Sequence, residues 1–219
     1  MNLNLETARH NMIEQQIRPW NVLDPVVLQS LQCLRREDFV PEQYKALAFS
    51  DLEVPLGRGQ CMYSPKLEAR LMQALSPQRG DNVLEVGTGS GYMAALLSTQ
   101  AQRVLSFEIV PELAATAQRN LEMAGVDHVE IMAGDGLPGN PERAPYDAIM
   151  LSGGVPQVPV DLLHQLKTGG RLVAVVGVYP LMRAQLYRRD ENNTFSCATL
   201  FETAVPMLEN IAQQDNFSL

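Results

Sequence analysis

"NVLEVGTGSGYMAALLS", residues 82–98, is a short apolar run that leads into three alternate glycines and then into an alanine-rich amphipathic segment. This order predicts a buried strand, a tight turn and a helix. Gly87, Gly89 and Gly91 leave the backbone of that turn free of side chains, so a ligand can approach it closely. In doubly wound sheets such a turn lies at the carboxyl end of the first strand, where ligands bind.

Strands and helices alternate after this stretch. The expected strands are Val83–Val86, Arg103–Glu108, Val129–Ala133, Ala148–Leu151 and Leu172–Gly177, and the expected helices are Tyr92–Thr99, Pro111–Met123 and Pro159–Leu166. Short apolar strands joined by such helices imply right-handed crossovers and a mostly parallel sheet. Residues 182–205 instead predict two antiparallel strands around the turn residues DENN. The predicted fold class is α/β, a doubly wound, mostly parallel, Rossmann-like sheet with an antiparallel C-terminal strand pair and an N-terminal helical addition.

The first 80 residues are expected to be helical with irregular connections. Asp24 before Pro25 and Ser64 before Pro65 are the expected N-caps of two helices. Residues 49–65 have little periodicity, and a long segment of this kind inside a compact domain is usually functional or disordered. We expect residues 1–80 to belong to the same domain as the core, residues 81–219.

Bulk composition restricts the partners. The net charge is −8, and no Lys/Arg cluster exceeds the pairs Arg35–Arg36 and Arg188–Arg189, which argues against a nucleic-acid partner. No apolar run approaches the roughly 20 residues that span a bilayer, and the N-terminus lacks the pattern of a secretory signal. Three scattered cysteines fit a reducing compartment better than a disulfide framework or a zinc site. We expect a cytoplasmic protein without a membrane partner or a metal, and the sequence does not indicate its oligomeric state.

The glycine spacing distinguishes between nucleotide ligands. A dinucleotide site usually has G-x-G-x-x-G/A, which would put a small residue where Tyr92 stands. No lysine follows the glycines to hold phosphates, so a P-loop is excluded. G-x-G-x-G after an acidic residue, here Glu85, is the usual first motif of methyltransferases that use S-adenosylmethionine.

Two further strand ends carry acidic residues. Glu108 ends the second strand, where a carboxylate can accept hydrogen bonds from both ribose hydroxyls of an adenosyl ligand. Asp135 lies between glycines after the third strand, where it could accept a hydrogen bond from an adenine amine, although GDG is equally a good turn. Together with the glycine turn, these residues predict a pocket for an adenosyl group with Tyr92 near its rim.

These motifs resemble those of the protein-L-isoaspartate O-methyltransferase family, and the likeness covers nearly the whole chain. The segments that carry it are VLEVGTGSGYMAALLS, GDGLPGNPERAPYDAIMLSGGVPQVP, LKTGGRLVAVVG and, upstream, residues 39–65. The resemblance implies methyl transfer from S-adenosylmethionine, with S-adenosylhomocysteine as product, to the α-carboxylate of L-isoaspartyl residues in damaged proteins or peptides. The resulting ester re-forms a succinimide. The cofactor-binding residues that we expect are Glu85, Gly87, Thr88, Gly89, Ser90, Gly91, Tyr92, Glu108, Ile109, Asp135 and Gly136.

The acceptor-side loop departs from the family pattern. The family reads G-Q-T-I-S-Q-P with an active-site serine, whereas residues 59–65 read GQCMYSP, so Tyr63 takes the serine position and Ser64 the glutamine position. Residues 152–156, SGGVP, also replace a Thr/Ala-rich run. A carboxylate acceptor is ionised near pH 7 and needs no general base, so catalysis depends on aligning the reacting atoms. The loss of one positioning hydroxyl weakens such a reaction without preventing it.

Tyr63 and Ser64 are therefore the candidate catalytic residues, with three interpretations. Tyr63 is a lid residue whose phenol positions an acceptor, or it is a plug that makes the enzyme weak or inactive toward isoaspartate, or Ser64 takes over after a small shift. Cys61 is expected to be an inert apolar residue, because it has no recognisable partner among His10, His128 and His164. Arg58 and Lys66 are expected to be solvated cations.

Other functions remain open on the sequence alone. A divergent paralogue that methylates another acceptor and a cofactor-binding pseudoenzyme both follow from the altered loop. Tyr92 argues against a nicotinamide oxidoreductase. The absence of N/D-P-P-Y after the fourth strand, together with the acidic charge, argues against a methyltransferase of nucleic-acid bases.

Overall fold

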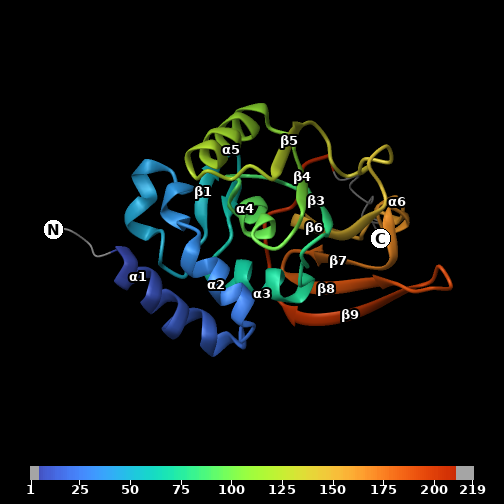
Figure 1. Ribbon diagram of the computed structural model, residues 1–219, viewed down its shortest axis with the longest axis horizontal. Helices are drawn as coiled ribbons and strands as arrows, with labels where there is room; N and C mark the ends of the chain where they lie inside the picture. The colour runs from blue at the N-terminus through green and yellow to red at the C-terminus, as the bar shows by residue number, and fades with distance from the viewer. Residues whose placement is uncertain (1–4, 211–219) are drawn as a thin grey trace, which may run out of the picture.

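A seven-stranded sheet forms the centre of the structure, a computed structural model that describes residues 5–210 (Figure 1). Its strand order is β5-β4-β3-β6-β7-β8-β9. Neighbouring strands from β5 to β7 are parallel, and β8 and β9 are antiparallel additions. The strands are β3 (Asn82–Val86), β4 (Arg103–Glu108), β5 (Val129–Ala133), β6 (Tyr146–Val155), β7 (Leu166–Val178), β8 (Leu181–Arg189) and β9 (Phe195–Glu202). The predicted fold class is confirmed.

The strand order reverses beside β3. The chain passes from β3 outward to β4 and β5 and then returns to place β6 on the other side of β3. Ligands bind at the carboxyl ends of strands at such a switch point. The glycine turn, residues 87–91, follows β3 at this point.

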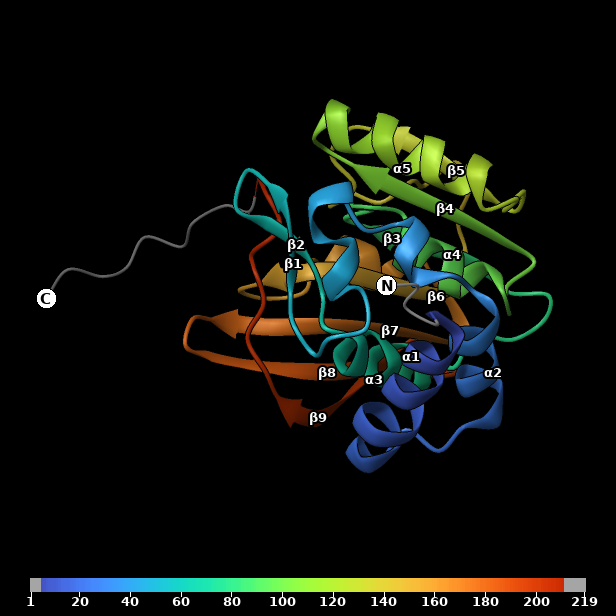
Figure 2. The same cartoon turned by 90° about the vertical axis from the view of Figure 1, so that its left-hand side faces the viewer.

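Both faces of the sheet are covered by helices. Apolar side chains of α3 (Pro65–Leu75) and α4 (Tyr92–Ser98) form a core with one face, and those of α6 (Val160–His164) form a core with the other. The longer α5 (Pro111–Met123) lies along β4 and β5 (Figure 2). Because both faces are buried, the parallel strands read as nearly continuous apolar runs, as the sequence indicates.

The N-terminal region packs on the α3 and α4 side of the sheet. It contains α1 (Leu5–Met12), a π-helical turn (Ile13–Ile17), α2 (Pro25–Cys33) and short 3-10 turns at Arg18–Trp20, Arg36–Asp38 and Glu42–Leu47. One apolar core joins side chains of this region to α3, α4 and α5. The carboxylate of Asp24 accepts a hydrogen bond from the backbone N–H of Val26 at 2.8 Å, so this predicted cap is confirmed.

Two details of the first 80 residues differ from the prediction. Ser64 occupies the N-cap position of α3, but its side chain makes no capping hydrogen bond. Residues 49–65 contain a hairpin of β1 (Val54–Gly57) and β2 (Gln60–Met62) rather than an irregular connection. The hairpin turn is made by Gly57, Arg58 and Gly59, which all have positive φ, and its strands are too short to produce a recognisable alternation.

Candidate active site

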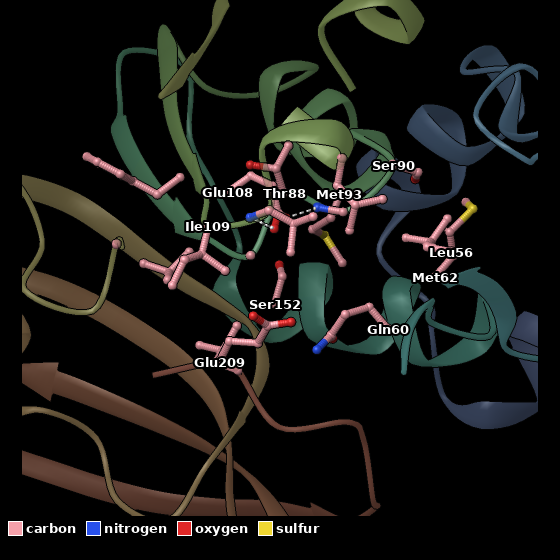
Figure 3. Close-up of a pocket in the computed structure, with 18 of the residues that line it drawn as sticks. Leu56, Gln60, Met62, Thr88, Ser90, Met93, Glu108, Ile109, Ser152 and Glu209 are labelled. Atoms are coloured by element: carbon pink, nitrogen blue, oxygen red, sulfur yellow. Dashed lines mark hydrogen bonds between the residues drawn. The ribbon is translucent and has the colours of Figure 1, made fainter. Parts of the chain in front are cut away.

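A pocket with about 770 Å³ of space, open to solvent, lies at the carboxyl ends of β3, β4 and β6 (Figure 3). All the predicted cofactor-binding residues line it except Glu85 and Gly91. The structure thus brings together the glycine turn and the two acidic strand ends, which are separated by almost 50 positions in the sequence.

The glycine turn forms the floor of the pocket. The backbone N–H groups of Gly87 and Thr88 both donate to the carbonyl oxygen of Phe107, at 2.8 and 3.1 Å. A Cβ on Gly87 would stand 2.8 Å from the Leu208 side chain and 3.1 Å from the Ser152 carbonyl oxygen. Gly91 has a different role, because a Cβ there would meet Ala117 on α5 at 3.2 Å. Gly87 therefore allows the close approach of Leu208 and of the β6 backbone, whereas Gly91 allows close packing of two helices.

Glu108 is fixed at the end of β4 by the backbone around it. Its Oε2 accepts a hydrogen bond from Gly89 N–H at 2.8 Å, and its Oε1 accepts one from Val110 N–H at 3.0 Å. The residue is 5% exposed. An ionised carboxylate has about four acceptor positions, so two are left for a ligand.

Glu85 lies beneath the turn, outside the pocket lining. Ser152 Oγ donates to its Oε1 at 2.7 Å, and Ser106 Oγ donates to its Oε2 at 2.6 Å. Burial raises the pKa of Glu85 to about 7, although the two serine hydrogen bonds oppose this rise. Thr88 continues the chain of hydrogen bonds through Ser106 at 2.6 Å. Glu85 reaches the pocket only through Ser152 and Thr88, which line it.

The loop after β5 supplies a further wall. The Asp135 carboxylate is exposed and accepts a hydrogen bond from Leu137 N–H at 2.9 Å, so the GDG segment is a turn as well as part of the lining. A Cβ on Gly136 would lie 2.5 Å from the Cβ of Phe107, so the loop can press against β4 only with glycine there. Ile109 also lines the pocket.

Tyr63 is a buried member of the lining. It is 6% exposed, and its hydroxyl has no hydrogen-bond partner within residues 5–210. Burial raises its pKa well above the ordinary value, and the nearby Cys61 and Glu85 add to this rise. The phenol therefore keeps its proton and can only donate to an anion. Ser64 is half-buried and does not line the pocket.

Arg36 holds the acceptor-side loop from below. It is 1% exposed and donates to Glu68 Oε2 at 2.5 Å, to the Tyr63 carbonyl oxygen at 2.8 Å and to the Ala48 carbonyl oxygen at 2.9 Å. Burial raises the pKa of Glu68 to about 7, and the neighbouring Arg36 lowers it. This arrangement connects the N-terminal region to the residue in the family's serine position.

Tyr92 is not at the rim, where we predicted it. It is 1% exposed, its ring centroid lies 5.4 Å from that of Phe39, and the guanidinium carbon of Arg36 lies 5.0 Å from the centroid. The rim prediction was wrong because these two residues of the N-terminal region bury the ring, so that Tyr92 lines the pocket from the core side.

The other residues of the loop have ordinary roles. Burial raises the pKa of Cys61 to about 12, which agrees with an inert thiol. Arg58 pairs with Glu112 at 3.3 Å on the surface. Lys66 pairs with Asp51 at 2.6 Å and lies over the Trp20 ring. We expected both cations to be solvated, but each has an acidic partner. Between residues 5 and 210 no cluster of side chains is suited to a metal ion.

Sequence reasoning missed part of the lining. Gln60 enters from the β1–β2 hairpin, Ser152 from the C-terminal part of β6, and Leu208 and Glu209 from the segment after β9. In the sequence, the only signal for Ser152 is that residues 152–156 depart from the Thr/Ala-rich run of the family. Leu208 and Glu209 follow no strand or motif, and their position depends on a long-range pairing of Met207 with Gly154.

The pocket fits an adenosyl group. The floor is the backbone of the glycine turn, one wall carries a fixed carboxylate with free acceptor positions, and apolar side chains flank it at Ile109, Leu113 and Leu137. Fold and pocket together define the class of Rossmann-like methyltransferases that use S-adenosylmethionine.

Comparison with known proteins specifies the family. Residues 7–211 match the family model described as Protein-L-isoaspartate(D-aspartate) O-methyltransferase (PCMT). A protein-L-isoaspartate O-methyltransferase of Methanospirillum hungatei is 42% identical over 171 residues, which cover 78% of this chain and 79% of the relative. Protein-L-isoaspartate O-methyltransferase 2 of Pelobacter propionicus is 44% identical over 174 residues, which cover 80% of this chain and 77% of the relative. This chain belongs to the protein-L-isoaspartate O-methyltransferase family.

Solved structures agree with this assignment. One protein-L-isoaspartate O-methyltransferase superposes with a TM-score of 0.79 at 26% identity, over 93% of this chain and 65% of that longer chain. A putative protein-L-isoaspartate O-methyltransferase from Plasmodium falciparum, solved in complex with S-adenosyl-L-homocysteine, gives a TM-score of 0.78 over 95% and 99% of the two chains. At 18% identity the second likeness bears on the fold alone.

Proposed function

We propose that this protein transfers a methyl group from S-adenosylmethionine to the α-carboxylate of L-isoaspartyl residues in damaged proteins or peptides. Family membership supports both the cofactor and this class of acceptor. The observation that carries the proposal is the side-chain-free turn at Gly87–Gly89, which stands beside the fixed carboxylate of Glu108.

The chain's own residues would bind and orient the reactants. S-adenosylmethionine supplies an electrophilic methyl group when it is bound. Glu108 would accept hydrogen bonds from the ribose, and Asp135 one from the adenine amine. Because an isoaspartyl carboxylate is already ionised near pH 7, no residue has to remove a proton, and alignment is the main contribution of the protein.

Tyr63 is the residue that we propose for alignment on the acceptor side. Its buried phenol is a donor without a partner in the described chain, in a pocket where an anionic acceptor must enter. A buried polar group without a hydrogen bond costs about 1–3 kcal/mol, and such a cost is often found where a ligand completes the site. Ser64 has no comparable position, because its side chain lies outside the lining.

A single assay tests the proposed function. The purified protein is incubated with radiolabelled S-adenosylmethionine and with matched isoaspartyl and aspartyl peptides, and base-labile methanol is measured. We expect label on the isoaspartyl peptide alone. Cofactor binding without transfer to either peptide would favour a divergent paralogue or a pseudoenzyme, the alternatives that the Tyr63 departure keeps open.

The Tyr63→Phe variant tests the role of the phenol. We expect the free energy of unfolding to rise by about 1 kcal/mol, because the orphan hydroxyl is removed. We expect kcat/KM for the isoaspartyl peptide to fall by about one to two orders of magnitude, with unchanged affinity for S-adenosylhomocysteine. Tyr187→Phe, which removes a hydroxyl bonded to Gln185 outside the pocket, is the matched control.

Two outcomes would contradict this role for Tyr63. Unchanged turnover in Tyr63→Phe would show that the phenol does not touch the acceptor. Faster turnover in Tyr63→Ser would show that the ring is a plug. The serine variant is the less clean test, because it also opens a cavity beside Leu67 and Leu71, which costs about 3–5 kcal/mol for a large ring.

We also propose that residues 1–80 and 81–219 form one domain, and that the protein acts in the cytoplasm. The shared core of the N-terminal region with α3, α4 and α5 supports the first proposal. The three free cysteines support the second. Across residues 5–210, none of the helices has the length and apolar character to cross a bilayer. The net charge of −8 argues against a nucleic-acid partner.

A further inference from the structure

The segment after β9 returns across the sheet as a strap, residues 206–209, that closes one side of the pocket. Gly154 N–H donates to the Pro206 carbonyl oxygen at 2.8 Å, and Leu208 N–H donates to the Gly154 carbonyl oxygen at 2.9 Å. Gln60 of the β1–β2 hairpin donates to the Met207 carbonyl oxygen at 3.4 Å. The strap is therefore fixed to β6 on one side and to the acceptor-side hairpin on the other.

The Leu208 side chain packs the strap against the backbone of two glycines. A Cβ on Gly153 would lie 2.4 Å from its Cδ2, and one on Gly87 would lie 2.8 Å from the same atom. Leu208 can occupy this place only because both positions are glycine. The next residue, Glu209, is thereby directed to the pocket, and Figure 3 shows its carboxylate beside Ser152 and across the pocket from Glu108.

Glu209 differs from the other acidic residues of the lining. Glu68 is paired with Arg36, Glu108 accepts two backbone hydrogen bonds, and Asp135 accepts one. Glu209 is exposed, and its carboxylate makes no hydrogen bond or ion pair in the described part of the chain. No lysine, arginine or histidine within residues 5–210 lines the pocket to neutralise it.

We infer that Glu209 is a cofactor-binding residue that accepts the α-ammonium group of S-adenosylmethionine. This inference rests on the proposed function, which assigns the ribose to Glu108 and the adenine to Asp135 in the half of the pocket formed by β4 and β5. Glu209 lies in the other half, with Ser152 of β6 and the turn after β3, where the methionyl end of the ligand remains to be bound. That end carries an ammonium group, and an unpaired carboxylate is its complement.

Calorimetry with three ligands tests the inference without any turnover. S-adenosylmethionine and S-adenosylhomocysteine carry the α-ammonium group, whereas 5′-methylthioadenosine lacks the entire amino-acid end. We expect Glu209→Gln to raise the Kd of the first two ligands by about 5- to 20-fold and to leave that of methylthioadenosine unchanged. Glu202→Gln is the control with the same change in net charge, because Glu202 is an exposed residue on β9 that pairs with Arg183 at 3.6 Å.

Three results would overturn the inference. A Kd for S-adenosylhomocysteine within about twofold of wild type in Glu209→Gln would contradict the role of Glu209 while leaving the proposed function intact. An equal loss for methylthioadenosine would show that Glu209 acts on the shape of the pocket and not on the ammonium group. If the wild-type protein bound none of the three ligands, the proposed function would fail together with the inference.

Discussion

The Glu108→Ala variant is expected to bind S-adenosylhomocysteine about 10²- to 10³-fold more weakly than the wild-type protein. Hydrogen bonds to a charged group contribute about 1.5–3 kcal/mol each, and the proposed ribose contacts would both be lost. The variant also leaves the backbone N–H groups of Gly89 and Val110 without their acceptor, so the glycine turn loses the group that fixes it. Calorimetric Kd values measure the effect.

A nearby acidic residue provides the control for this variant. Glu112, in the first turn of α5, is exposed, and within residues 5–210 its carboxylate pairs only with the exposed Arg58. Because surface ion pairs contribute about 0–1 kcal/mol, Glu112→Gln is expected to leave both ligand affinity and stability nearly unchanged. A folded Glu108→Ala protein whose Kd stayed within about threefold of wild type would contradict the assignment of the ribose to Glu108.

The half of the site that binds the adenosyl group could be predicted because its residues are local to strand ends. Gly87, Glu108 and Asp135 each lie at the end of a strand or within two residues of it, and parallel strands bring their carboxyl ends to one edge of the sheet. The same pattern explains why every predicted strand of the parallel sheet is found. The turn residues around Arg58 could have indicated the β1–β2 hairpin, since LGRGQ has glycines on either side of one residue.

The strap and the buried arginine could not be predicted in this way. Glu209 reaches the pocket only through the pairing of Met207 with Gly154, which are more than 50 residues apart. In the sequence, Arg36 is half of an Arg-Arg pair, a pattern typical of a solvated surface. Its burial depends on acceptors supplied by three separate segments, at Ala48, Tyr63 and Glu68. The periodicity and spacing of residues in the sequence do not indicate such long-range contacts.

The Arg36→Met variant is expected to lower the free energy of unfolding by about 3–5 kcal/mol, because it removes one partner of a buried ion pair. Methionine has a similar length, but it leaves the Glu68 carboxyl and the carbonyl oxygens of Ala48 and Tyr63 without their donor. Chemical denaturation measures the loss. Arg18→Met is the control, since Arg18 and Glu14 form an exposed pair that contributes less than about 1 kcal/mol.

The destabilisation by Arg36→Met is also expected to grow with pH. Burial raises the pKa of Glu68 above its ordinary value of 4.5 to about 7, and Arg36 keeps it from rising further. In the variant the folded pKa is therefore higher still, and the buried carboxyl stays protonated. Stability from a group with a raised folded pKa is complete below the unfolded pKa and is lost as pH rises through the folded one. The difference from wild type should thus be larger near pH 8.5 than near pH 5.5.

A second substitution separates the charge of Glu68 from the packing around it. In Arg36→Met/Glu68→Leu no carboxyl remains to be ionised, so the additional loss at high pH should disappear while the two carbonyl oxygens still lack their donor. Part of the stability should return, and the acceptor-side loop should remain less well fixed, seen as a raised KM for the isoaspartyl peptide. A loss below about 1 kcal/mol at both pH values in the single variant would mean that Arg36 does not hold Tyr63 in place, and the proposed alignment of the acceptor would then need another support.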